Sequence, residues 1–122
     1  MIRRNERGFS LIEVMISLAI LSVGLLAVAS MQITSIKGNF SSGNVTHATV
    51  LAQSKLEELR RLSYTDSNLM SGQHSEGAIS GSIFSMFYDV ADITSTMKAI
   101  TVTVRWTDAG DHNISLSTIR AK

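Results

Sequence analysis

One apolar run, Leu11–Met31, constrains the fold of this chain more than any other part of its sequence. The run holds 21 of the 122 residues and a single charged side chain, Glu13. As a helix it would be about 31 Å long at ~1.5 Å per residue, which matches the hydrocarbon thickness of a bilayer. We therefore expect a membrane-spanning helix followed by one small soluble domain.

Glu13 is the residue that breaks the apolar pattern. Insertion scales put the cost of a charged side chain at the centre of a membrane helix at roughly 2.5–3.5 kcal/mol. Glu13 lies near the start of the run, where its side chain can reach the interface and where the positive end of the helix favours a carboxylate. Once the helix is packed against other apolar surfaces, the Glu13 carboxylate still needs an interaction partner or a functional role.

The residues before the run set its orientation. Arg3, Arg4 and Arg7 precede it, and basic residues favour the cytoplasmic side, so we expect the C-terminal part to cross the membrane. The run is longer than the apolar stretch of a secretory signal. The triplet Ala27-Val28-Ala29 nevertheless fits a signal-peptidase cut, which leaves removal of the whole helix as an alternative.

Helical patterning continues beyond the membrane segment and predicts one helix of roughly fifty residues, ending near Leu62. Apolar residues keep a spacing of three to four positions at Val45, Ala48, Ala52, Leu56 and Leu59. From Tyr64 to Ser82 the chain is polar and contains glycine, so we predict a long connecting loop there.

The C-terminal third changes to the alternating pattern of strands. We predict strands within Ile83–Val90, Ala99–Trp106 and Asn113–Arg120, with a turn at Thr107–His112. The expected product is a three-stranded antiparallel meander whose apolar face is covered by the helix segment Val45–Leu59. Trp106 is expected to be a core anchor of this α+β head.

Composition excludes several kinds of site. The chain has no cysteine and therefore no disulfide or thiolate zinc site, and its formal net charge of +1 gives no basic surface for nucleic acid. No nucleophile motif of the Gly-x-Ser-x-Gly type occurs, so we expect a non-enzyme without a cofactor. His47, His74 and His112 are scattered, and we expect them at the surface or at its boundary.

Asp108 and Asp111 are weak candidates for a calcium site. Their segment offers several oxygens but lacks the twelve-residue loop and the terminal glutamate of a specific calcium motif. A solvated hairpin turn is the alternative interpretation of the same residues.

The block Gly8-Phe9-Ser10-Leu11-Ile12-Glu13-Val14, which follows a short basic leader, resembles the class III signal of the type IV pilin superfamily. A long helix followed by a small antiparallel sheet is also similar to that superfamily. Shorter segments resemble minor pilins of the PilV type, namely Gly24–Leu26, Leu51–Gln53, Leu56–Leu62 and Val102–Asp108. The mid-helix proline and the C-terminal disulfide common in major pilins are absent from this chain.

The resemblance implies that a prepilin peptidase cuts between Gly8 and Phe9 and methylates the new amino group of Phe9. Glycine suits the cut because a residue without a Cβ lets the enzyme approach the backbone closely. The resemblance also implies that Arg3, Arg4 and Arg7 hold the leader at the cytoplasmic face. Glu13 would pair with the positive N-terminal amine of a neighbouring subunit during assembly.

These observations predict a pilin-like chain with a leader at residues 1–8, a transmembrane helix half at 9–31 and an extracytoplasmic head at 32–122. The helix, about residues 9–62, would pack on the three-stranded sheet. The predicted function is a minor subunit that primes, caps or modifies a type IV pilus. One alternative is a minor pseudopilin of a type II secretion system, and another is a single-span inner-membrane protein with a periplasmic binding domain.

The expected partners are the prepilin peptidase and methyltransferase, major and other minor pilins, the inner-membrane assembly platform and the lipid bilayer. The expected location is the inner membrane, as a single-pass chain with its N-terminus in the cytoplasm, before assembly. After assembly the chain would lie in a cell-surface or periplasmic filament.

Overall fold

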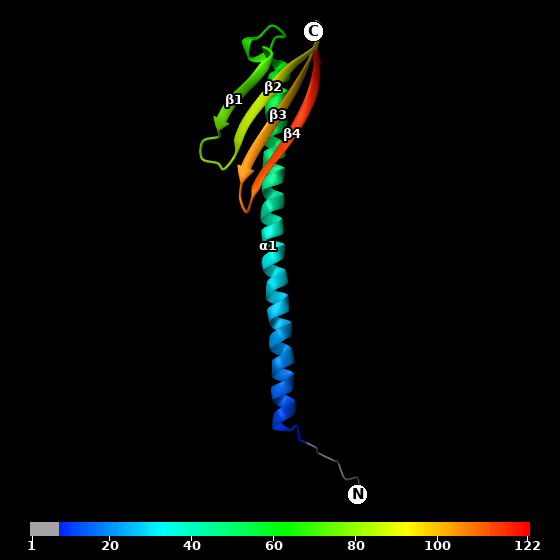
Figure 1. Cartoon of the computed structure of the whole chain (residues 1–122), viewed down its shortest axis with the longest axis vertical. Coiled ribbons are helices and arrows are strands. Elements are labelled where there is room, and N and C mark those ends of the chain that lie inside the picture. The colour runs from blue at the N-terminus through cyan, green and yellow to red at the C-terminus, as the bar shows by residue number, and fades with distance from the viewer. Residues whose placement is uncertain (1–7) are drawn as a thin grey trace. The chain divides into compact units, whose positions relative to one another are not determined.

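The computed structural model describes residues 8–122, which form one long helix, one short helix and four strands (Figure 1). The long helix α1 runs from Leu11 to Arg61, close to the predicted bounds of 9–62. It begins with an acidic residue in its first turn, Glu13, and ends with two basic ones, Arg60 and Arg61. Both charge placements complement the helix dipole.

Contacts divide the chain into two compact units, one ending at Asn39 and one comprising Phe40–Lys122. In the second unit the final part of α1 is followed by a 3₁₀ turn, η1 (Ser67–Leu69), and by four strands: β1 (Gly72–Ala78), β2 (Ser85–Thr94), β3 (Met97–Thr107) and β4 (Asp111–Ala121). The strands form one antiparallel sheet in the order β1-β2-β3-β4. The α+β layout with a long helix on an antiparallel sheet is confirmed.

The prediction of three strands was wrong, because β1 forms within the segment expected to be a loop. Its sequence, Gly-Gln-His-Ser-Glu-Gly-Ala, has no alternating apolar residues and therefore carries no strand signal of its own. It becomes a strand by pairing with β2 and through side-chain contacts made over long sequence distances. The His74 ring stacks on Tyr88 of β2 with ring centroids 4.7 Å apart.

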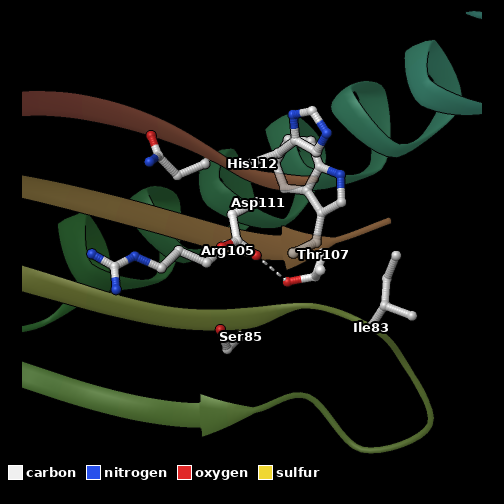
Figure 2. Close-up of a pocket in the computed structure, with 8 residues that line it drawn as sticks. Ile83, Ser85, Arg105, Thr107, Asp111 and His112 are labelled. Carbon is white, nitrogen blue, oxygen red and sulfur yellow. Dashed lines mark hydrogen bonds between the residues drawn. The ribbon is translucent and has the colours of Figure 1, made fainter. Parts of the chain in front are cut away.

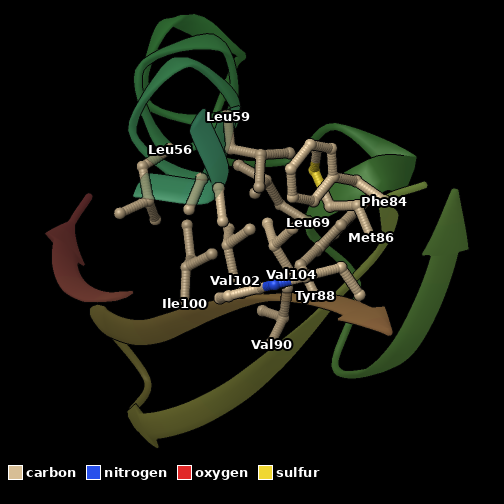
Figure 3. Close-up of a cluster of buried hydrophobic side chains, with 13 residues drawn as sticks. Leu56, Leu59, Leu69, Phe84, Met86, Tyr88, Val90, Ile100, Val102 and Val104 are labelled. Carbon is tan, nitrogen blue, oxygen red and sulfur yellow. The ribbon is translucent and has the colours of Figure 1, made fainter. Parts of the chain in front are cut away.

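The core lies between the last part of α1 and one face of the sheet (Figure 3). Alternate residues of β2 and β3 point into it, as the sequence pattern predicts, and Trp106 is only 4% exposed, which confirms it as a core anchor. The helix contributes the buried side chains Ala48, Ala52, Leu56 and Leu59. Val45, predicted to belong to this face, is 42% exposed instead.

Two charged side chains tie α1 to the outer strands of the sheet. The Arg120 guanidinium on β4 donates to the carbonyls of Leu59 and Arg60, which are among the unpaired acceptors at the end of the helix. Lys55 Nζ lies 2.8 Å from Glu76 Oε1 on β1 and 3.3 Å from Glu58 Oε1. Burial lowers the pKa of Lys55, but its pairing with Glu76 and Glu58 outweighs this and leaves the pKa above its ordinary value.

Candidate functional site

The start of α1 is organised by Ser10, which stands immediately before the helix. The Ser10 carbonyl accepts from the backbone N–H of Glu13 at 3.1 Å and of Val14 at 3.2 Å, and the Ser10 side chain lies 3.3 Å from the Glu13 nitrogen. A serine followed three residues later by a glutamate is the spacing of a capping box. This local signal was not used in the sequence interpretation, although it fixes Glu13 in the first turn of the helix.

Glu13 lies in a shallow groove on the side of the helix. The groove is lined by Phe9, Glu13, Val14, Ser17, Leu18 and Leu21. The Ser17 hydroxyl donates to the Glu13 backbone carbonyl at 2.8 Å. No side chain in residues 8–122 forms an ion pair or a hydrogen bond with the Glu13 carboxylate, so this acid is available to a group from outside the described part of the chain.

The Gly8-Phe9 bond lies just ahead of this groove. Phe9 is 84% exposed. In the described residues, a Cβ built on Gly8 would meet no atom within 4 Å. The fold of residues 8–122 therefore gives no steric reason for glycine at this position. Arg3, Arg4 and Arg7, the leader charges, lie outside the described residues.

The first half of α1 has an apolar surface that nothing in its own unit covers. Large side chains from Leu11 to Ile36 are exposed along this part of the helix. The serine hydroxyls of this segment form hydrogen bonds with the backbone of the same helix. Ser22 donates to the Leu18 carbonyl at 2.7 Å and Ser30 to the Leu26 carbonyl at 2.8 Å. Hydroxyls satisfied by their own helix are compatible with an apolar environment. By length and composition α1 can span a membrane.

The β3–β4 hairpin holds the second pair of candidate residues, Asp108 and Asp111. Asp111 accepts a hydrogen bond from the Thr107 hydroxyl at 2.8 Å across the hairpin (Figure 2). Asp108 accepts from the Asn44 amide of α1 at 3.1 Å and lies 2.9 Å from His112 Nε2. The two carboxylates thus have different partners, and residues 8–122 contain no cluster of three acidic or histidine side chains placed to hold a metal ion.

Asp108 connects the hairpin to the helix, a contact spanning 64 positions of sequence. The hydrogen bond from Asn44 holds the pKa of Asp108 below its usual value, and the bond from the Ala109 N–H and the charge of His112 act in the same direction. A carboxylate whose pKa is lower in the folded state stabilises that state above its unfolded pKa of 3.8, and the contribution is lost as the pH falls through the folded pKa.

We therefore expect Asp108→Asn to destabilise the head at pH 7 and to have a progressively smaller effect as the pH falls below 3.8. Below its folded pKa the wild-type carboxyl is itself protonated and the difference between the two proteins disappears. Urea midpoints of both proteins in a pH series from 7 downward test this expectation, with Asp89→Asn, an exposed change on β2, as control. An equal loss at every pH would mean that the charge of Asp108 contributes nothing.

The three histidines lie at the surface or its boundary, as predicted. His47 stacks on Phe84 with centroids 6.2 Å apart, and His112 stacks on Trp106 at 5.4 Å.

Beside this aromatic group lies a groove near the β3–β4 hairpin, and its lining includes Ile83, Ser85, Arg105 and Asn113. The Arg105 guanidinium lies 4.8 Å from the centre of the Phe87 ring and covers it.

Comparison with known proteins finds one family match, to the prokaryotic N-terminal methylation motif, over residues 3–29. The matched segment includes the leader arginines, the Gly8-Phe9 bond, Glu13 and most of the apolar run. It is the class III signal of type IV pilin precursors. No curated protein and no solved structure matches the chain. The N-terminal segment therefore carries a pilin-type processing signal joined to a helix that can anchor the precursor in a membrane.

Proposed function

We propose that this chain is a minor, prepilin-like subunit of a type IV pilus, cut between Gly8 and Phe9, methylated on the Phe9 amine and assembled through α1. The observation that carries the proposal is the methylation motif over residues 3–29 followed by an unbroken helix that starts at Leu11. The chain would then be a substrate of the prepilin peptidase and a building block, with no catalysis and no cofactor of its own.

The open surroundings of Gly8 support cleavage at this bond. Within residues 8–122 a Cβ at this position would meet no atom within 4 Å, so the described fold does not itself require glycine there. A peptidase that approaches the backbone closely would favour a residue without a Cβ at this position. Arg3, Arg4 and Arg7 would keep the leader at the cytoplasmic face, where this enzyme acts on the precursor.

The free Glu13 carboxylate supports the proposed role in assembly. Cleavage creates a positive amine on Phe9, and Glu13 lies about one turn further along in the same groove. In a bundle of such helices, the Glu13 of one subunit and the amine of a neighbour would neutralise one another in an apolar environment. A subunit out of register would leave both charges unpaired, so the pair selects the correct register.

The apolar surface of the first half of α1 would have two successive roles. Before assembly it would contact lipid, and after assembly it would contact the same surface of neighbouring major and minor pilins on the inner-membrane platform. The compact unit Phe40–Lys122, which makes up most of the predicted head, would remain outside the helical bundle and prime, cap or modify the filament. The precursor would be a single-pass inner-membrane protein with a cytoplasmic N-terminus, and the mature chain would be part of a surface filament.

The test is the composition of filaments sheared from the native host. We expect the mature chain in the sheared pilus fraction, in smaller amount than the major subunit, and its loss from that fraction when the major subunit is deleted. A tagged chain that instead co-purifies with secretion components would identify a type II pseudopilin. A chain that stays in the membrane fraction with an intact N-terminus would contradict both filament functions.

A further inference from the structure

Three short segments of this chain have the sequence Asn-x-Ser/Thr, with no proline in the middle, which is the pattern that accepts N-linked glycans. They are Asn39-Phe40-Ser41, Asn44-Val45-Thr46 and Asn113-Ile114-Ser115. An enzyme that recognises this pattern has to reach the asparagine amide and the hydroxyl two residues later at the same time. Whether a segment can be modified in the folded chain therefore depends on where these two side chains lie.

The first two segments lie within α1, which separates their two side chains. Successive residues of a helix turn by about 100°, so side chains two positions apart point about 200° apart around the axis. In the second segment both groups also have partners. The half-buried Asn44 amide donates to Asp108 at 3.1 Å, and the Thr46 hydroxyl donates to the Ser42 carbonyl at 3.0 Å. Neither helical segment presents its amide and hydroxyl together.

The third segment lies in β4, the strand at one edge of the sheet (Figure 1). Side chains two positions apart in a strand lie on the same face, so Asn113 and Ser115 share one face. Ile114, between them, packs against the core, which places this pair on the outer face, where both residues are exposed. The Ser115 hydroxyl contacts the Thr103 hydroxyl at 2.9 Å, and no hydrogen bond in residues 8–122 involves the Asn113 side chain.

An acidic side chain lies next to this pair. Asp111 stands two positions before Asn113, so it lies on the same face, and it is exposed. Its Oδ1 accepts from the Thr107 hydroxyl, whereas its Oδ2 has no partner within residues 8–122. A basic side chain of a transferase can bind such a carboxylate. The helical segments carry Lys37 and Ser42 at the corresponding position.

We propose that Asn113 is the attachment site of an N-linked glycan, added by an oligosaccharyltransferase outside the cytoplasm. The co-substrate is an oligosaccharide carried on a polyprenyl diphosphate. The Asn113 Nδ2 forms a bond to the anomeric carbon of the first sugar, and the bond between that carbon and the phosphate oxygen breaks. The lipid diphosphate leaves with the electron pair, and a base of the transferase takes the proton that Nδ2 loses.

The outer face of the sheet suits a glycan at this position. It carries pairs of hydroxyls across β3 and β4, with Thr101 and Ser117 3.0 Å apart, and these groups can hydrogen-bond to sugar hydroxyls. A bulky hydrophilic group beside β4 would also hinder this edge strand from pairing with other chains. The proposal rests on the proposed function only for its orientation, with Phe40–Lys122 outside the cytoplasm, and does not depend on filament assembly.

Mass spectrometry of the chain from its native host tests the proposal. Trypsin cleaves after lysine and arginine, so Asn113 lies in the fragment Trp106–Arg120 and both helical segments lie in Gly38–Lys55. We expect Trp106–Arg120 to be heavier by the mass of an oligosaccharide, with fragment ions that place the sugar on Asn113. We expect Gly38–Lys55 to have its unmodified mass.

Three substitutions separate recognition of the pattern from other causes. Asn113→Gln removes the acceptor and Ser115→Ala removes the hydroxyl, so both should abolish the modification completely. Ser115→Thr keeps a hydroxyl at the same position of an exposed strand and should retain it. Immunoblots of the membrane fraction check that all three variants accumulate like the wild type.

The orientation of the chain is measured in the same cells, by adding a protease to spheroplasts. If the protease digests Phe40–Lys122 from outside and Trp106–Arg120 is nevertheless unmodified, this proposal alone is wrong. If the protease cannot reach the unit, the orientation is wrong and the proposed function fails with it. A sugar that persists in Asn113→Gln, or one found on Gly38–Lys55 instead, would also overturn the assignment to Asn113.

Discussion

Replacing Glu13 by alanine is expected to exclude the chain from filaments while leaving cleavage at the Gly8-Phe9 bond intact. The Glu13 carboxylate has no partner within residues 8–122, and the proposed partner is the Phe9 amine of a neighbouring subunit. Breaking a desolvated ion pair by removing one member costs about 3–5 kcal/mol. Since 1.4 kcal/mol corresponds to a factor of ten, incorporation should fall by at least about a hundredfold. Immunoblots of sheared filaments, normalised to the membrane pool, measure this ratio.

A second substitution separates the charge of Glu13 from the size of its side chain. The Glu13 N–H donates to the Ser10 side chain, and glutamine at this position keeps that N–H and a side chain of similar size. If the pair with the amine is what matters, Glu13→Gln will be excluded from filaments like Glu13→Ala. Ser17→Ala, one turn further along the same groove, is the matched control and should incorporate normally. Normal incorporation of Glu13→Gln would mean that assembly does not need the charge of Glu13.

The largest effect on stability is expected from Leu59→Ala. Leu59 is 1% exposed and lies between α1 and the sheet (Figure 3). Truncating a fully buried leucine costs about 2–5 kcal/mol, because the transfer free energy is lost and a cavity remains. Val50→Ala, on the same helix at a 56% exposed position, should change the free energy of unfolding by no more than about 0.5 kcal/mol.

The single tryptophan reports this difference directly. Trp106 is buried in the same core, so its fluorescence follows unfolding of the head in urea. The free energies of unfolding of wild type, Leu59→Ala and Val50→Ala are compared in the same detergent. A loss below about 1 kcal/mol for Leu59→Ala would mean that α1 does not form one side of the core in solution.

The parts of the fold predicted correctly are those whose signal is local. The apolar run and the spacing of Ala48, Ala52 and Leu56 indicate the helix and its buried face. The alternation of Ile100, Val102 and Val104 indicates β3. Each of these patterns lies within one element, so no knowledge of its neighbours is needed.

The parts that were missed depend on partners far away in the sequence. β1 is held by Lys55 of α1 and by Tyr88 of β2, and nothing in Gly72–Ala78 itself encodes a strand. Arg120 reaches carbonyls about sixty positions earlier. The open edge of β4 exists only because the strand order leaves it last, which is a property of the topology.

The candidate processing site can be proposed from the sequence because its whole signal is contained in a few consecutive residues, and cleavage there stays a prediction. Gly8, Phe9 and Glu13 lie within six positions, and the family match over residues 3–29 covers all three. For the β3–β4 hairpin, the sequence predicts the turn but not the contacts that its residues make with other elements. The turn around Asp108 and Asp111 follows from their residue types, whereas the bond from Asn44 to Asp108 connects different elements.

The most direct test of the account is the mass of the N-terminal peptide of the chain extracted from its native host. We predict a chain that begins at Phe9 and is heavier by one methyl group than the cut sequence. A Gly8→Val variant, in which a branched side chain obstructs the cut, should keep its full precursor mass. A wild-type chain that begins at Met1, or one cut near Ser30, would contradict processing as a pilin precursor and with it the proposed assembly through α1.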